Sequence, residues 1–182
     1  MVKIDLEGKI LQETPYFVNA AGFTIHSAVH TAVENAHFVM HLHSDQGVAV
    51  SAQKEGLLPL SQHAMICLPH LAYHDYEGIA LDHDERDRLV ADLGDKSMML
   101  LRNHGTLTLG KTAGDCWTNM FYLERACKQQ TMALSGGRDN VLIAPQAAQD
   151  VVAQQIARGL GGALPWPGLL RKLDRHLPGY DG

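Results

Sequence analysis

Residues 38–44 read Phe-Val-Met-His-Leu-His-Ser, a compact apolar run that leads into two histidines one residue apart. A short apolar run of this kind is typical of a buried strand. Side chains two positions apart on a strand point to the same face of a sheet, so His41 and His43 are expected to be neighbours. The ends of strands in open α/β sheets are common positions for ligand sites. This stretch therefore predicts a strand and, at its end, part of a site.

A second apolar run, from Ser97 to Leu101, leads into Asn103-His104-Gly105, and residues 106–110 continue as a strand. The glycine allows a sharp backbone bend beside His104. Two histidines on one face and a third from an adjacent strand end would offer three nitrogen ligands, with a fourth position open for water or substrate, as in catalytic zinc sites. The alternative is that His104 is a histidine hydrogen-bonded within a turn. The total of 11 histidines in 182 residues favours a metal or proton-transfer site.

Outward from these stretches, strands and helices alternate, which predicts an α/β layered domain with a mixed sheet. An N-terminal hairpin is expected to bracket the sheet, and the charged helix is expected to begin at Asp84 and to stop at Gly94. Thr112 and Asp115 have the spacing of a helix-capping pair. The C-terminal tail, with Pro165, Pro167 and Pro178, is expected to be irregular. The other expected elements are helices at 26–36, 45–54, 112–136 and 146–159, and strands at 56–59 and 70–73.

The composition excludes several classes of function. With a formal charge of −5 and no basic stripe, the chain is not expected to bind nucleic acid or an anionic membrane. No stretch approaches the roughly 18 apolar residues of a membrane-spanning helix. The three cysteines show no metal-binding spacing and are interpreted as buried thiols of a cytoplasmic protein.

Several blocks of the sequence, in the same order, resemble the class II aldolase and adducin family. The blocks with the metal-ligand motifs are Val39 to Ser44 and Leu101 to Gly105. Further blocks are Gly22 to Ala28, Val50 to Ala52 with Gly56 to Pro59, Ala72 to Tyr76, and Ser135 to Gly137. The likeness covers residues 1–140, which we interpret as the family's domain with its front shortened. Residues 141–182 are interpreted as a C-terminal helix and an irregular tail rich in proline and glycine.

The resemblance implies a three-layer α/β/α fold with a central mixed, largely antiparallel sheet, often assembled as a homo-tetramer. It implies a divalent metal held by His41, His43 and His104, with zinc expected first and iron or manganese as alternatives. It also implies a lyase that acts on a hydroxy-carbonyl or sugar-derived small molecule through a metal-bound enediolate.

The sequence departs from the aldolases in three places. His26 stands where the aldolases carry a catalytic glutamate. Adducin heads resemble this chain in having a histidine there. Imidazole can also move a proton near neutral pH. His63 lies near the position of a tyrosine that a neighbouring aldolase subunit contributes as proton donor. We treat both as candidate catalytic residues, with a local structural role as the alternative. The Gly-Asn-Ile-Ser-like loop that grips the substrate phosphate is not found, so the sequence represents either a shortened relative or a fragment.

These departures leave two other functions open. The first is an inactive adducin-like module that works by self-association. The second is a three-histidine site that holds ferrous iron for oxygen chemistry, because three neutral nitrogens accept either metal.

Overall fold

A four-stranded mixed sheet forms the centre of the molecule in the computed structural model, which describes residues 1–78, 85–157 and 161–181. The strand order is β1-β4-β3-β2. β1 pairs antiparallel with β4, β4 antiparallel with β3, and β3 parallel with β2. The bounds are β1 (Phe38–Leu42), β2 (Leu71–His74), β3 (Met98–Leu101) and β4 (Gly105–Gly110).

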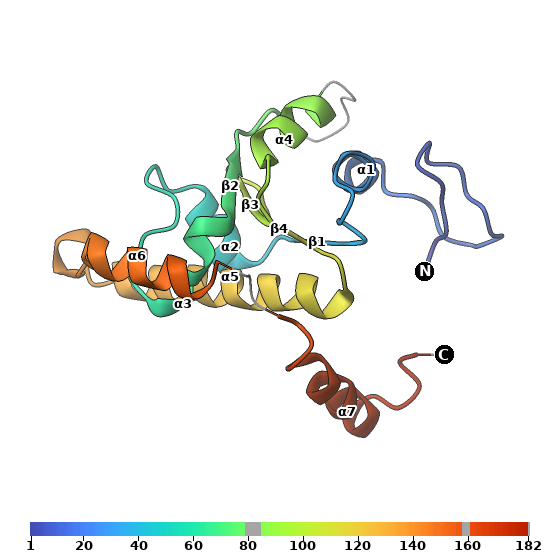
Figure 1. Cartoon of the computed structure of the whole chain (residues 1–182). Helices are drawn as coiled ribbons and strands as arrows, with labels where there is room; N and C mark the ends of the chain where they lie inside the picture. The colour runs from blue at the N-terminus through green and yellow to red at the C-terminus, as the bar shows by residue number, and fades with distance from the viewer. Residues whose placement is uncertain (79–84, 158–160, 182) are drawn as a thin grey trace.

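Helices cover both faces of this sheet (Figure 1). On one face, Met99 and Leu101 pack with residues of α1 (Ala20–Ala32) and α4 (Glu85–Leu93). On the other face, Met98 and Leu100 pack with residues of α2 (Asp45–Ser51), α3 (Gln62–Cys67) and α5 (Ala113–Leu134). The alternation follows from the two-residue period of a strand, which sends successive side chains of β3 into different cores. The expected three-layer α/β/α fold is confirmed.

Local signals in the sequence account for where the central helices begin. Thr112 caps α5: its hydroxyl accepts a hydrogen bond from the Asp115 amide at 3.1 Å and donates one to the Asp115 carboxylate at 2.7 Å. Ser44 caps α2 by accepting from the Gly47 amide at 2.9 Å. Such caps satisfy backbone donors that have no partner within the first helical turn. Ser44 directly follows His43, so the helix begins where the histidine pair ends.

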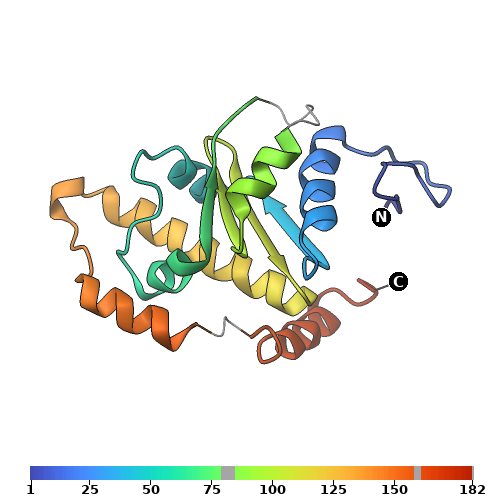
Figure 2. The same ribbon diagram turned by 45° about the horizontal axis from the view of Figure 1, so that its top comes forward.

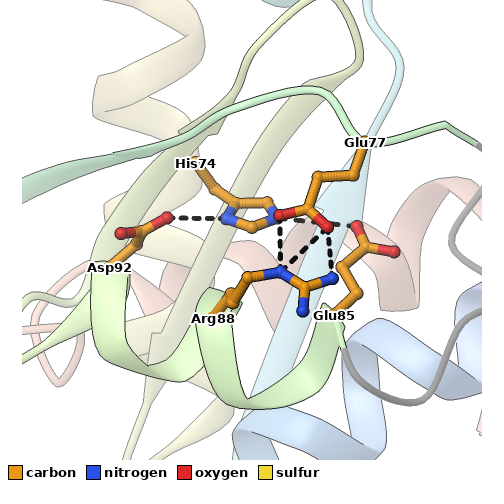
Figure 3. Close-up of polar contacts among 5 residues, drawn as sticks. All are labelled: His74, Glu77, Glu85, Arg88 and Asp92. Atoms are coloured by element: carbon orange, nitrogen blue, oxygen red, sulfur yellow. Dashed lines mark hydrogen bonds and ion pairs between the residues drawn. The ribbon is translucent and has the colours of Figure 1, made fainter.

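A polar cluster attaches α4 to the carboxyl end of β2 (Figure 3). The His74 side chain is buried, with Nδ1 2.7 Å from an Asp92 oxygen and Nε2 3.5 Å from a Glu85 oxygen. Beside it, Arg88 donates to both carboxylate oxygens of Glu77. Because Glu77 follows the strand and the other partners lie on α4, the cluster holds the segment after β2 against this helix.

The expected strand at residues 56–59 is wrong. The segment is irregular, although Leu57 and Leu58 are buried. The Leu57 amide donates to the Tyr73 hydroxyl at 2.9 Å, and the Leu58 amide donates to the Gln130 side-chain oxygen at 2.6 Å. Side chains thus satisfy backbone groups that a neighbouring strand would otherwise pair, and burial alone does not require a ladder.

The two ends of the chain also differ from expectation. The N-terminal hairpin is reduced to a single bridge between Ile4 and Ile10 and lies outside the central sheet. The tail is not irregular throughout, because it contains α7 (Trp166–His176). Pro167 lies in the first turn of that helix, where proline is tolerated since the amide there has no helical partner. Figure 2 shows α7 and the N-terminal segment at the margin of the molecule.

The helices expected at 45–54, 112–136 and 146–159 lie close to their expected positions, whereas α3 was not expected. Against the expected 26–36, α1 starts earlier, at the Asn19 cap. Between α5 and α7 lies α6 (Gln146–Gln155), and two 3-10 turns cover Leu68–His70 and Arg138–Asn140. Asp84, the expected start of the charged helix, lies outside the described residues.

Candidate metal centre

Three histidine rings converge at one edge of the sheet. His41 lies in β1, His43 follows the end of that strand, and His104 lies in the loop between β3 and β4. The ring centroids are 4.6 Å apart for His41 and His43, 4.8 Å for His41 and His104, and 4.6 Å for His43 and His104. One nitrogen from each ring lies within 4.8 Å of the other two. The structure therefore brings together the three histidines that the sequence analysis singled out as ligands.

Two backbone features allow this approach. Asn103 has a φ of 55°, in the left-handed region that closes a tight hairpin loop, and the His104 amide donates to the Leu101 carbonyl at 3.1 Å. A Cβ atom at Gly105 would lie 2.3 Å from the Leu42 carbonyl oxygen and 3.2 Å from a ring carbon of His43. Only glycine leaves room for the end of β1 to pass this close to the loop that carries His104.

The hydrogen bonding of His41 sets the state of its ring. Its Nδ1 lies 2.9 Å from the Thr106 carbonyl oxygen, which can only accept, so Nδ1 donates and Nε2 carries a lone pair. That Nε2 lies 2.8 Å from Nε2 of His43. Burial lowers the pKa of His41 to about 4, and the charges of His104, His43 and His26 act in the same direction. Burial, and then the charges of His43 and His74, also lower the pKa of His104. Neutral rings are the form that binds a metal ion.

The donor set therefore fits a divalent ion. Three neutral imidazoles around a tetrahedral ion at about 2.0–2.1 Å would have their nitrogens roughly 3.3 Å apart. Nε2 of His41 and Nε2 of His43 are 2.8 Å apart, and one nitrogen from each of the three rings lies within 4.8 Å of the other two. His43 is exposed and the other two rings are partly exposed, so one side of the centre is open.

A carboxylate behind the rings links the two segments that carry them. Glu124, on α5, accepts a short hydrogen bond from the hydroxyl of Ser44 and a second one from the hydroxyl of Thr106 at 2.7 Å. Ser44 follows His43, and Thr106 holds His41 through its carbonyl oxygen. Gly47 leaves space for this contact, since a Cβ there would lie 2.7 Å from the Ser44 hydroxyl. Glu124 thus buttresses the segments of both β1 and β4.

Comparison with known proteins identifies the family of the chain. Residues 1–131 match the family described as Class II Aldolase and Adducin N-terminal domain. The chain belongs to this family.

Among class II aldolase and adducin relatives, a Caulobacter vibrioides protein that carries an aldolase class 2 name is 69% identical over 182 residues, covering 99% of this chain and 71% of that protein. Alpha-adducin of Rattus norvegicus is 41% identical over 148 residues, covering 79% of this chain and 20% of adducin. The crystal structure of an aldolase II superfamily protein from Pseudomonas syringae superposes with a TM-score of 0.93 at 45% identity, covering 100% of this chain and 74% of that one. The fold and the family therefore agree.

His26 lies on the same side of the molecule as the three histidines. It projects from α1, is partly buried, and its charge acts on the pKa of His41. Burial, and then the charge of His30, lower the pKa of His26 itself. The ring lines a cavity of about 600 Å³ between α1 and the N-terminal segment, together with Phe23 and Ser27. The catalytic role expected of His26 stays a prediction.

His63 is not part of this group within one chain. It lies on α3, with its ring 5.4 Å from that of Tyr122 and its Nδ1 3.2 Å from the Gln129 side-chain nitrogen. Both neighbours belong to α5. A role in a neighbouring subunit's site, which the family resemblance suggested, therefore stays a prediction.

The sequence analysis missed Glu124, because nothing near it in sequence marks it. The residue lies in the middle of an amphipathic helix, and only the packing of α5 against β4 gives it partners. Ser44 carried a usable signal, as a capping residue placed directly after the histidine pair. Within the described ranges 1–78, 85–157 and 161–181, no helix is both long enough and apolar enough to cross a membrane.

Proposed function

We propose that this chain is a metal-dependent lyase. It acts on a hydroxy-carbonyl or sugar-derived small molecule, breaking or forming a carbon–carbon bond next to the carbonyl group. The divalent ion, zinc in the first place, is held by His41, His43 and His104. The observation that carries the proposal is the convergence of three ring nitrogens, one of them aimed by the hydrogen bond from His41 to the Thr106 carbonyl.

Each part of the chain has a defined task in this proposal. When bound, a divalent ion supplies Lewis-acid polarisation of a carbonyl oxygen and offsets the negative charge that develops there. The three imidazoles fix the position of this charge at the edge of the sheet. In cleavage, His26 takes the proton of the hydroxyl on the carbon β to the carbonyl, and it returns a proton to the α carbon. It acts as a general base that is neutral near pH 7 because burial lowers its pKa.

The proposal includes a homo-oligomer in the cytoplasm. In an assembly, His63, which is partly exposed on α3, would donate a proton at the site of a neighbouring subunit. Family membership supports self-association, since its named relatives include both aldolases and adducins. The three free cysteines Cys67, Cys116 and Cys127 are all buried, which suits a reducing compartment.

A second candidate function is an inactive, adducin-like association module. It is favoured by the 41% identity with rat alpha-adducin and by the histidine at position 26. Ferrous iron in the same centre is a third candidate, because three neutral nitrogens with an open position also suit that ion.

The test combines metal content with turnover. We expect purified protein to bind about one zinc or other divalent ion per chain, and His104→Ala to lose it. His176→Ala, at an exposed histidine of α7, is the matched control and should bind metal normally. A screen of hydroxy-keto acids and sugar phosphates should then reveal cleavage that requires both the ion and His26. Absence of any bound metal, even after addition of zinc, would refute the lyase, and metal binding without turnover would favour the association module.

A further inference from the structure

A second hollow lies beside the loop that carries His104. Its volume is about 670 Å³. The lining residues come from the end of α2, the segment after β2 and the loop between β3 and β4: Ser51, Ala52, Gln53, Lys54, Asp75, Tyr76, Arg102 and Asn103.

This hollow adjoins the segment that carries His104. Asn103 precedes His104 in the chain, and the ring of Tyr76 lies 6.5 Å from the His104 ring. Arg102 and His104 are two residues apart, so their backbones are at most about 7 Å from each other. A small molecule with one end at the histidines can therefore place its other end in the hollow.

Arg102 is held in place within this wall. One of its terminal nitrogens donates to the Gln53 carbonyl oxygen at 2.8 Å. Its guanidinium carbon lies 4.4 Å from the centre of the Tyr73 ring, in a cation–π contact. Tyr73 is fixed in turn, because its hydroxyl accepts from the Leu57 amide. The guanidinium is thus preorganised, which lowers the entropic cost of binding a ligand.

The charge of Arg102 is not neutralised within the described part of the chain. The ion pairs there do not include Arg102, Lys54 or Asp75. Arg102 is partly buried and meets only a neutral carbonyl and an aromatic face. The hollow therefore contains two unpaired cationic groups and one carboxylate, in a chain whose overall formal charge is −5.

We propose that this hollow is an anion subsite, in which Arg102, assisted by Lys54, binds a carboxylate or phosphate at the end of the substrate remote from the reacting carbonyl. A guanidinium offers parallel N–H donors that match two oxygens of either group. Asp75, on the same wall, accepts a hydrogen bond from a substrate hydroxyl and disfavours a second anionic group. The substrate class narrows to short hydroxy-carbonyl compounds with one anionic terminus. This assignment of the substrate rests on the proposed function, whereas the anion subsite itself does not.

The experiment measures anion binding to the full-length, metal-free chain. Inorganic phosphate and acetate are titrated separately and followed by NMR, for the unchanged protein and four variants. We expect Arg102→Gln to weaken binding of the preferred anion about tenfold, Lys54→Gln to weaken it less, and Arg102→Lys to restore part of it. Arg125→Gln is the matched control, at an exposed arginine of α5 that packs over Phe121. The anion that binds with the higher affinity shows whether the subsite prefers a phosphate or a carboxylate.

Three outcomes overturn the inference. They are no saturable binding of either anion, equal binding by Arg102→Gln and the unchanged protein, and equal weakening by Arg125→Gln. A change in oligomeric mass in Arg102→Gln, with unchanged anion affinity, also overturns it and assigns the hollow to contact with a second copy.

The result is separable from that of the lyase test. If the chain binds the anion but has no affinity for metal, the proposed lyase function is refuted and the anion subsite is supported. If the chain binds metal but no anion, the anion subsite is refuted and the proposed metal site is supported.

Discussion

Glu124 and Thr106 are joined by a hydrogen bond of 2.7 Å between the carboxylate and the threonine hydroxyl. The same threonine accepts the Nδ1 hydrogen of His41 through its carbonyl oxygen. The carboxylate on α5 therefore supports the candidate metal centre at one remove, through Thr106. Groups in this position orient metal ligands and are worth roughly 10–100-fold in metal affinity.

We therefore expect Glu124→Gln to weaken zinc binding about tenfold while the fold is kept. The amide retains the shape of the side chain, but one of the two oxygens that accept from Ser44 and Thr106 becomes an NH2 group, which can only donate. Competition with a chromophoric chelator measures the affinity. Glu34→Gln, at an exposed position after α1, serves as control, and equal affinities in the two variants would contradict the assigned role.

The stability of the metal-free protein should depend on pH through His41. Its pKa is about 4 in the folded chain and 6.5 in the unfolded chain. The unfolded state thus binds more protons between these values, so the contribution of His41 is complete above pH 6.5 and is lost as pH falls toward 4. Because the ring is partly exposed, we expect a loss of about 2 kcal/mol by the lower end of this range.

Denaturant unfolding in the presence of a chelator, near neutral pH and again in the acidic range, measures this loss. Carboxylates also titrate in acid, so the informative quantity is the difference between the unchanged protein and His41→Gln. The variant should lose less stability on acidification. Identical losses in the two proteins would show that His41 is not the group responsible.

Replacement of Gly105 by alanine should destabilise the protein by about 2–3 kcal/mol. The added Cβ would lie 2.3 Å from the Leu42 carbonyl oxygen, so β1 and the hairpin loop must separate. Thermal unfolding reports the cost, and metal affinity should fall with it. Gly161→Ala is the control, because nothing lies within 4 Å of a Cβ at that position.

Loss of the His74 side chain should cost about 3 kcal/mol of stability. His74→Ala leaves the carboxylate of Glu85 buried beside an empty space and removes the partner of Asp92. An exposed histidine offers the comparison: His37→Ala should change the free energy of unfolding by no more than about 0.5 kcal/mol. A similar small change in His74→Ala would mean that the polar cluster of Figure 3 does not hold α4 to the sheet.

Much of the fold could be predicted from sequence because local patterns coincide with tertiary structure there. The apolar runs before His41 and His104 are strands, and the Thr112–Asp115 pair does cap a long helix. Prediction failed where side chains from distant elements decide the structure. Leu57 and Leu58 have the composition of a strand, yet Tyr73 and Gln130 satisfy their amides.

The convergence of the histidines could be predicted only in part. Same-face periodicity brought His41 and His43 together, and the strand end before Gly105 offered His104, which the family resemblance then supported. The residues that organise the centre, Glu124 and Thr106, are not marked by any local motif. Their role arises from the packing of α5 against β4, which no short stretch of sequence specifies.

The position of β1 at the edge of the sheet has a kinetic consequence. β1 joins the described sheet through β4, and His41 is 65 positions from its partner Thr106. An ion shared by His41, His43 and His104 would cross-link β1 to the hairpin of β3 and β4, which lies much later in the sequence. This cross-link can form only after the strands have paired. It should therefore lower the rate of unfolding and leave the rate of folding unchanged.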